Sequence, residues 1–184
     1  MTTKERILET ALDLFLNHGV DGTGIERILR DSQTSRGGLY HHFKDKQALY
    51  EAVLAHYFLG PFKELDVDAF AQLPMQDQQL LLVALFKNMP NLIDTITPHG
   101  ASRYFAFFFD SLTRSEIFGD SVRKYYRGLL HAMQTAITRE APHVMADKTA
   151  RAFLARLEGE IYLCGVLGGP PDFSRLENEI LKGN

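Results

Sequence analysis

A run of polar and basic residues near the amino end has side-chain types that suit contact with a nucleic-acid backbone. Residues 32–46 read Ser-Gln-Thr-Ser-Arg-Gly-Gly-Leu-Tyr-His-His-Phe-Lys-Asp-Lys, and no acid precedes Asp45 in this run. Fixed positive charge comes from Arg36, Lys44 and Lys46. Lysine and arginine neutralise phosphates, which supplies much of a protein's affinity for nucleic acid. The run is therefore a candidate DNA contact.

The same run has two glycines where a helix would favour alanine. Thr34 and Ser35 are residue types that begin helices, so a short helix is predicted to follow them. Gly37 and Gly38 each cost that helix about 1 kcal/mol relative to alanine. A glycine lets another surface approach the backbone closely, and the floor of a DNA major groove is one such surface.

The residues before this helix predict a second short helix and a tight turn. Thr23 and Glu26 have the spacing of a capping box, which predicts a helix that begins near Gly24 and ends near Asp31. The polar residues 32–34 fit the short connection between two steeply crossing helices. The pattern predicts a helix-turn-helix, in which the second helix enters the major groove and the first braces it.

Longer helices are predicted on either side of this pair. Before it, Thr2 and Glu5 fit a capping box and Gly19 is placed to end the helix. After it, Asp45 can cap a connecting helix that runs to Gly60-Pro61. Their apolar residues recur at helical spacing, at Ile7, Leu8, Ala11, Leu12 and Phe15 and then at Leu49, Ala52, Val53 and Tyr57.

The chain resembles the tetracycline-repressor (TetR) family of transcription regulators over roughly residues 4–50. The resemblance lies in the spacing of Leu14-Phe15, Gly19, Thr23, Ile25, Ile28, Ser35-Arg36-Gly37-Gly38-Leu39-Tyr40-His41-His42-Phe43 and Lys46. The sequence departs from the family's usual pattern at Gly24, Leu29 and Gln33. Gln33 stands where the turn usually has glycine, so the turn must accommodate a side chain there.

The resemblance implies which residues of the amino-terminal helices, called the headpiece below, touch DNA. Those facing base edges or adjacent phosphates would be Thr34, Ser35, Arg36, Gly37 and Gly38. Those holding phosphates would be Thr23, Tyr40, His42 and Lys46, and His41 could do either. Arg36 is chemically suited to read guanine through two hydrogen bonds, whereas Lys46 would position the protein without reading sequence.

Each of these residues taken alone also fits an ordinary structural role. Tyr40 can be a core aromatic and Arg36 can belong to a plain charged surface, but the joint spacing favours DNA contact. Leu39 and Phe43 lie four residues apart and are predicted to face the core.

The composition limits the kind of partner. The 184 residues are 45% hydrophobic with a net charge of -3. Residues 1–47 hold seven Lys or Arg against seven Asp or Glu, so any DNA contact must be a local patch.

The single Cys164 excludes an internal disulfide and lies in an apolar run that predicts a buried thiol. His41 and His42 lack a partner at helical metal-binding spacing, so neither a metal nor another cofactor is predicted. No signal peptide or membrane span is recognised, and a cytoplasmic protein is expected.

The rest of the chain predicts an all-α fold. We expect a helix-turn-helix domain over residues 1–47 and a helical effector-binding and dimerisation domain over residues 48–184. Seven prolines punctuate the pattern, and residues 80–86 and 104–109 are apolar nearly all round, which predicts helices buried on several sides.

Aromatic residues in this body could line a cavity for an apolar or aromatic small molecule. The candidates are Phe58, Phe62, Tyr104, Phe105, Phe108 and Phe109. Plain core packing is the alternative for any one of them. The family resemblance implies an effector pocket in the body without naming the ligand.

Two long helices near the carboxyl end carry apolar stripes. They are predicted over residues 119–140 and 147–168, with Gly159, Gly165 and Gly168 allowing close approach. Such a hairpin can pair with its twin across a twofold axis, or it can pack inside one chain. The resemblance favours the homodimer, because two headpieces must span successive half-sites on DNA.

These features predict a ligand-responsive transcription regulator that acts as a repressor released from a palindromic operator by its effector. One alternative is a helical ligand-binding or interaction module without DNA binding. Another is a small helical enzyme using His99, His131 or His143 as acid or base, although no catalytic motif accompanies them.

Overall fold

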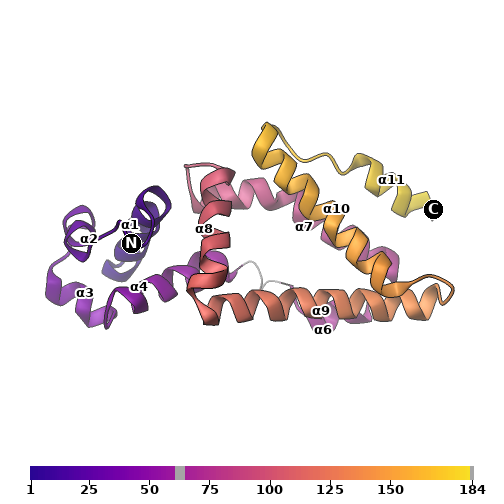
Figure 1. The fold of residues 1–184 in the computed structure, drawn as a ribbon, viewed down its shortest axis with the longest axis horizontal. Helices are drawn as coiled ribbons and strands as arrows, with labels where there is room; N and C mark the ends of the chain where they lie inside the picture. The colour runs from indigo at the N-terminus through magenta and orange to yellow at the C-terminus, as the bar shows by residue number, and fades with distance from the viewer. Residues whose placement is uncertain (61–64, 183–184) are drawn as a thin grey trace. The chain divides into compact units, whose positions relative to one another are not determined.

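The computed structural model describes residues 1–60 and 65–182, and all regular elements in them are helical (Figure 1). They are α1 (Thr3–His18), α2 (Ile25–Asp31), α3 (Arg36–His42), α4 (Lys46–Val53), the π-helical turn η1 (Leu54–Phe58), α6 (Val67–Gln72), α7 (Met75–Ile96), α8 (Ala101–Arg114), α9 (Glu116–Glu140), α10 (Ala146–Leu167) and α11 (Ser174–Lys182). The predicted all-α class is confirmed for these residues. None of these helices combines the length and apolarity needed to span a bilayer.

The described residues divide into two compact units. Unit 1 holds residues 1–60, 97–99 and 103–122, and unit 2 holds residues 65–96, 100–102 and 123–182. Helix α8 therefore belongs almost entirely to unit 1 with the first four helices, whereas α9 begins in unit 1 and continues in unit 2. The predicted functional boundary after residue 47 stays a prediction, since the compact unit around the headpiece extends further.

Unit 1 has an aromatic core that joins three helices. Phe15 of α1 is buried, and its ring centroid lies 5.9 Å from that of Tyr50 in α4 and 6.4 Å from that of Phe107 in α8. Both α4 and α8 pack against α1, so the aromatic core of unit 1 extends beyond the headpiece. The predicted ends of α1 are confirmed by the Thr2–Glu5 capping box and by Gly19, whose φ of 71° ends the helix.

Unit 2 is a bundle in which the predicted apolar stripes form the core of a single chain. The buried residues are Leu129, Met133, Ala136 and Ile137 of α9 and Ala150, Leu154, Leu157 and Ile161 of α10. Intrachain packing, the alternative to pairing with a twin, therefore accounts for these stripes. Helix α11 was not predicted; it packs Leu176 and Ile180 inward, and its Glu177 pairs with Lys87 of α7 at 2.7 Å.

Three expectations about the body are wrong. Pro90 lies inside α7 rather than at its end, with Phe86 and Ile93 buried on either side of it, so packing offsets the missing backbone hydrogen bond. The segments 80–86 and 104–109 are not buried on several sides, because Leu85 and Phe109 are exposed. Cys164 is half-buried, and its Sγ donates to the carbonyl oxygen of Gly169 at 2.6 Å.

Candidate nucleic-acid interface

The turn between α2 and α3 is held by hydrogen bonds to backbone carbonyl oxygens. The N–H of Thr34 donates to the Leu29 carbonyl at 3.0 Å, and Arg6 of α1 donates from Nε to the Ser32 carbonyl at 3.0 Å. Gln33 has a φ of 51°, and no other described non-glycine residue has a positive φ. The turn therefore requires a left-handed backbone conformation. Glycine adopts this conformation without strain, whereas Gln33 adopts it at an energetic cost.

One face of helix α3 is buried against the headpiece, and the opposite face is exposed. Ser35 caps it by accepting a hydrogen bond from the Gly38 N–H at 3.1 Å, as a helix-starting residue should. Leu39 and Phe43 are buried, which confirms their predicted core role. The opposite face, with Arg36 and Tyr40 one turn apart, is exposed.

Most of the predicted DNA contacts lie on or beside this open face. Tyr40 is 43% exposed, and Ser35, Arg36, Gly37, His41 and His42 are also exposed. Thr34, Gly38 and Lys46 are half-buried, and the Thr34 hydroxyl donates to the Ser32 carbonyl at 3.2 Å. The helix thus brings a guanidinium, a phenol and imidazoles together over an apolar anchor.

The two glycines of α3 meet different surroundings. A Cβ on Gly37 would have nothing within 4 Å, so that position is open to an approaching surface. A Cβ on Gly38 would lie 3.0 Å from Thr34 Cγ2 and 3.3 Å from Ser35 Oγ. A side chain at Gly38 would therefore crowd the helix cap, whereas Gly37 leaves the backbone open to an approaching surface.

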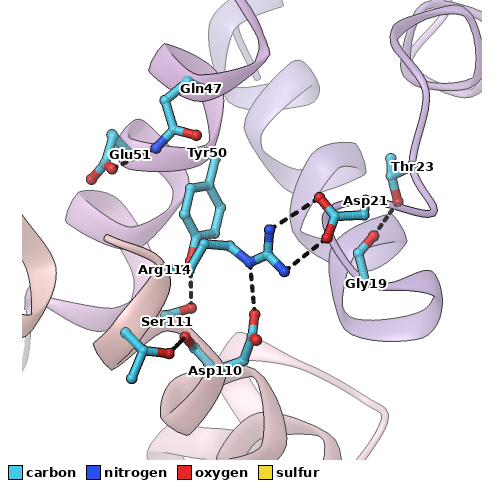
Figure 2. A network of polar contacts seen from close by, with 10 residues as sticks. Gly19, Asp21, Thr23, Gln47, Tyr50, Glu51, Asp110, Ser111 and Arg114 are labelled. Carbon is cyan, nitrogen blue, oxygen red and sulfur yellow. Dashed lines mark hydrogen bonds and ion pairs between the residues drawn. The ribbon is translucent and has the colours of Figure 1, made fainter. Parts of the chain in front are cut away.

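Thr23 has a different role from the two predicted for it. Its hydroxyl is buried and donates to the carbonyl oxygens of Gly19 at 2.8 Å and Leu14 at 3.2 Å (Figure 2). The predicted capping box is wrong, because the cap of α2 is Gly24, which makes no side-chain hydrogen bond. Thr23 ties the end of α1 to the start of α2, so its hydroxyl is engaged inside the chain.

An acid outside the predicted set contacts the open face. Glu26 of α2 forms an ion pair with the Arg36 guanidinium, and both side chains are well exposed, at 75% and 63%. Exposed pairs contribute about 0–1 kcal/mol, so release of Arg36 to DNA would cost little. Asp31, the other acid near the turn, is engaged by Arg30 at 2.8 Å, and that hydrogen bond lowers the pKa of Asp31.

This headpiece matches a known family. Residues 7–53, which run from the first part of α1 through α4, match the model described as bacterial regulatory proteins, tetR family. Residues 7–53 are therefore similar to the amino-terminal region of tetR-family regulators.

Sequence relatives agree with this assignment. The chain is 24% identical over 182 residues to YerO, an HTH-type transcriptional regulator of Bacillus subtilis, with 84% of this chain and 63% of YerO covered. It is 39% identical over 54 residues to the regulator QacR of Staphylococcus aureus, with 29% of each chain covered. The chain thus spans under two thirds of the length of these relatives.

Solved structures share the fold. NalD, the secondary repressor of the MexAB-OprM multidrug efflux pump in Pseudomonas aeruginosa, superposes with a TM-score of 0.62 at 19% identity, covering 98% of this chain and 96% of that one. Reduced NemR of E. coli superposes with a TM-score of 0.59 at 18% identity, covering 100% and 96%. The described helices therefore share the fold of these two proteins, and the family that residues 7–53 match consists of regulatory proteins rather than enzymes.

Helix α8 is tied to the headpiece by polar contacts. Arg114 donates two hydrogen bonds to Asp21, in the loop after α1, at 2.9 and 3.0 Å, and a third to Asp110 at 2.9 Å (Figure 2). These hydrogen bonds lower the pKa of Asp21 and raise that of Arg114. His99, just before α8, lies 2.6 Å from Asp13 of α1.

A second set of contacts joins α8 to the connecting helix. Tyr50 of α4 donates from its hydroxyl to Ser111 at 2.8 Å (Figure 2). Ser115, just after α8, donates to Glu51 at 2.7 Å. Burial raises the pKa of Tyr50. Just beyond, Leu54–Phe58 form a π-helical turn, a local irregularity often found at functional positions. Sequence reasoning missed these contacts, because nothing in the spacing of α8 shows which helix it meets.

The predicted effector residues are largely packed. The rings of Phe58 and Tyr104 stack at 5.0 Å, and both are buried. Phe105 and Phe108 are half-buried, and Phe109 is 59% exposed. Phe62 lies outside the described residues. A groove of about 410 Å³ lies elsewhere, between α7, α10 and α11, and is lined by Phe153, Arg156, Leu176 and Ile180 among others.

Proposed function

We propose that this chain is a ligand-responsive, DNA-binding transcription regulator that represses by occupying a palindromic operator. The observation that carries the proposal is the open face of α3, where Arg36, Tyr40 and His41 are exposed over buried Leu39. Such a short helix, anchored by its apolar face and free of acids, suits insertion into a major groove. The TetR-family match supports the same role.

The proposed contacts divide by what they can read. Arg36 would read a guanine edge, and Gly37 would let the backbone approach the groove floor. Tyr40, His42 and Lys46 would hold phosphates and set the register, and Thr34, Ser35 and His41 complete the contact set. Gly38 contributes by shaping the helix start, and Thr23 is left out because its hydroxyl is buried and bonded within the chain.

The carboxyl-terminal part of α10 favours a homodimer. Its exposed large apolar side chains are Tyr162, Leu163, Val166 and Leu167. A cluster of apolar side chains on a single chain usually marks a surface that another protein covers. A second copy paired there would supply the second headpiece that a palindromic operator needs. We expect this dimer to act in the cytoplasm.

Release by an effector would pass through α8 and the connecting helix. Arg114, Ser111 and Ser115 hold α8 on the headpiece and on α4, so a ligand that favours another position of α8 would shift the headpiece. Phe105, Phe108 and Phe109 remain proposed effector contacts, whereas Phe58 and Tyr104 could take part only if their stacked rings separate. Coupling of this kind is typically about 1–3 kcal/mol, or roughly 5- to 150-fold in affinity.

The test is selection of bound duplexes from a random pool at fixed salt, followed by salt titration of variants. Arg36→Ala should relax sequence preference at one position by about 1–3 kcal/mol. Lys46→Ala should weaken all duplexes about equally and reduce the salt slope by about one unit. Failure to enrich any duplex, or no change with either variant, would exclude this interface and leave a helical interaction module.

A further inference from the structure

Glu26 is an acid placed where the proposed function requires contact with a polyanion. It lies in the first turn of α2, its side chain is 75% exposed, and it pairs with Nη2 of Arg36, the first residue of α3. Phosphates repel a carboxylate at such a face, so Glu26 opposes DNA binding unless the duplex gives it a partner. Glu158 of α10 differs, because it is half-buried and accepts a hydrogen bond from the Tyr126 hydroxyl inside unit 2.

The cation that Glu26 engages is not the one that its own helix offers. Arg30 lies four residues after Glu26, which is the usual spacing of a glutamate and an arginine that pair on one helix. The structure instead directs Arg30 and Arg27 to Asp31, at 2.8 and 3.5 Å. Glu26 is thereby left for Arg36, so an acid of α2 and the guanidinium of α3 form one unit across the turn.

Both helices that carry the pair are anchored in the core of unit 1. Ile28 of α2 and Leu39 of α3 are fully buried, and the Thr34 N–H donates to the Leu29 carbonyl at 3.0 Å across the turn. Side chains that start from fixed backbones have less freedom to lose when they meet. The carboxylate and the guanidinium therefore remain within reach of each other when either one touches DNA.

Together the two side chains offer both kinds of hydrogen-bonding group. A guanidinium has five N–H donors in a planar fork, so donors for N7 and O6 of guanine remain when Glu26 engages Nη2. An ionised carboxylate only accepts hydrogen bonds. In the major groove, guanine presents the acceptors N7 and O6, and its paired cytosine presents the donor N4–H beside them. The Glu26–Arg36 pair thus has groups complementary to the whole edge of a G·C pair.

The charge of Glu26 makes this choice of base selective. An exposed ion pair is weak, so it persists in the groove only if the carboxylate gains a new donor for the water that it loses. Cytosine N4 supplies that donor. An acceptor of guanine or thymine at the same place would leave a desolvated carboxylate unpaired, and such an unpaired charge against the wrong partner is one source of specificity.

We propose that Glu26 determines operator specificity together with Arg36, and that the two side chains read one G·C pair. Arg36 donates to N7 and O6 of the guanine, and Glu26 accepts from N4 of the paired cytosine. The same carboxylate weakens binding to duplexes that lack this pair. This inference rests on the proposed function, since it names the base pair that the open face of α3 recognises.

The first test changes a single atom group of the DNA. It uses the full chain and a duplex selected from a random pool, with affinities measured by fluorescence anisotropy at fixed salt. The position at which Arg36→Ala relaxes preference should be a G·C pair. N4-methylcytosine there replaces the N4–H that faces the groove, so it should weaken the unmodified chain at least about fivefold and Glu26→Ala less than about twofold.

The control for this test is N4-methylcytosine placed outside the half-sites, which should weaken neither protein. Another base pair at the position read by Arg36 would overturn the proposal. So would N4-methylation that weakens the two proteins equally, or that weakens neither.

A matched pair of variants separates base recognition from net charge. Glu26→Gln keeps the length of the side chain but adds a donor, so discrimination between the G·C pair and the other three pairs should fall at least about fivefold. Glu9→Gln removes the same charge from an exposed position of α1 and should leave this discrimination unchanged. Unchanged discrimination in Glu26→Gln, or equal changes in both variants, would reduce Glu26 to a background charge and contradict the proposal.

The double variant tests whether Glu26 and Arg36 act as one unit. With Arg36 present, Glu26→Gln removes a charged acceptor that holds the cytosine, whereas with Arg36→Ala it removes only a repelling charge. The fold change in affinity that Glu26→Gln causes should therefore differ at least about threefold between the two backgrounds. The same fold change in both would show that the two residues act independently and would overturn the shared recognition.

The selection distinguishes failure of this inference from failure of the proposed function. Enriched duplexes in which Arg36→Ala relaxes one position and Glu26→Gln relaxes none would remove only the role of Glu26. Enrichment of no duplex would remove the proposed regulator and the role of Glu26 with it.

Discussion

Helix α3 and the neighbourhood of Glu158 hold charged groups under opposite conditions. On α3 the cation and hydrogen-bonding groups are in water, and the apolar anchor Leu39 lies beneath them. At Glu158 the acid lies among tyrosines and apolar side chains, and its polar neighbour is a neutral hydroxyl. Charge on α3 therefore costs the fold almost nothing and is available to a large polyanion, whereas charge at Glu158 lowers the stability of the fold.

The largest expected effect comes from removing the anchor of α3. Leu39 is fully buried, so Leu39→Ala should lower the free energy of unfolding by about 2–5 kcal/mol. Urea unfolding followed by circular dichroism measures this change. Tyr40→Ala on the open face is the control and should change stability far less; equal losses would contradict the division of α3 into an anchor and an open face.

Alanine substitutions at the two glycines of α3 should change stability less, and the two positions should respond differently. Gly37→Ala should stabilise the fold by up to about 1 kcal/mol and weaken duplex binding, because its Cβ points into open space that DNA would occupy. Gly38→Ala should gain no stability, because its Cβ meets the Thr34 side chain at 3.0 Å. Thermal unfolding and duplex titration of both variants test this contrast, and equal stabilisation would show that the cap can give way.

The turn before α3 offers a stability change of about the same size or less. Gln33→Gly should raise the free energy of unfolding by up to about 1 kcal/mol, since glycine adopts a φ of 51° without strain, although its freedom in the unfolded chain offsets part of the gain. Gln33→Ala keeps the strain and is the control in the same urea titration. A gain in alanine as large as in glycine would rule out backbone strain as the cause.

The smallest expected effect is the pH dependence at Glu158. Because burial raises its folded pKa above the ordinary 4.5, the unfolded chain loses this proton first as pH rises. The contribution of Glu158 to stability should therefore fall from pH 4.5 upward and level off above the folded pKa. Unfolding free energies of the unmodified chain minus those of Glu158→Gln should show this decline, and a difference that rises with pH would contradict it.

The sequence predicted the headpiece well because its signals are local. Capping at Thr2 and Asp45, the helix end at Gly19 and the burial of Leu39 all depend on neighbours within a few residues, and all are confirmed. The special turn at Gln33 was also expected from its departure from glycine. Thr23 shows the limit of this reasoning. Its hydroxyl donates to the carbonyl oxygen of Leu14 in α1 instead of capping α2.

The body was predicted less well because its determinants lie far apart in sequence. The attachment of Arg114 to Asp21 joins residues 93 positions apart, and no spacing rule connects them. The aromatic run of α8 was expected to wall a pocket, but Phe107 stacks on Phe15 of the headpiece. Glu158 gave no signal in the sequence, since a single acid among apolar residues is usual on a helix whose other face meets water.

The π-helical turn Leu54–Phe58 has an evolutionary consequence. A π turn takes up about one residue more than an α-helical turn, so loss of one residue there could restore regular geometry while the helix on either side keeps nearly the same rotation about its axis. A single-codon deletion within α4 would instead rotate every residue before it by roughly 100 degrees about the helix axis, so the π turn is the place where the chain length can change with the least effect on the aim of α3.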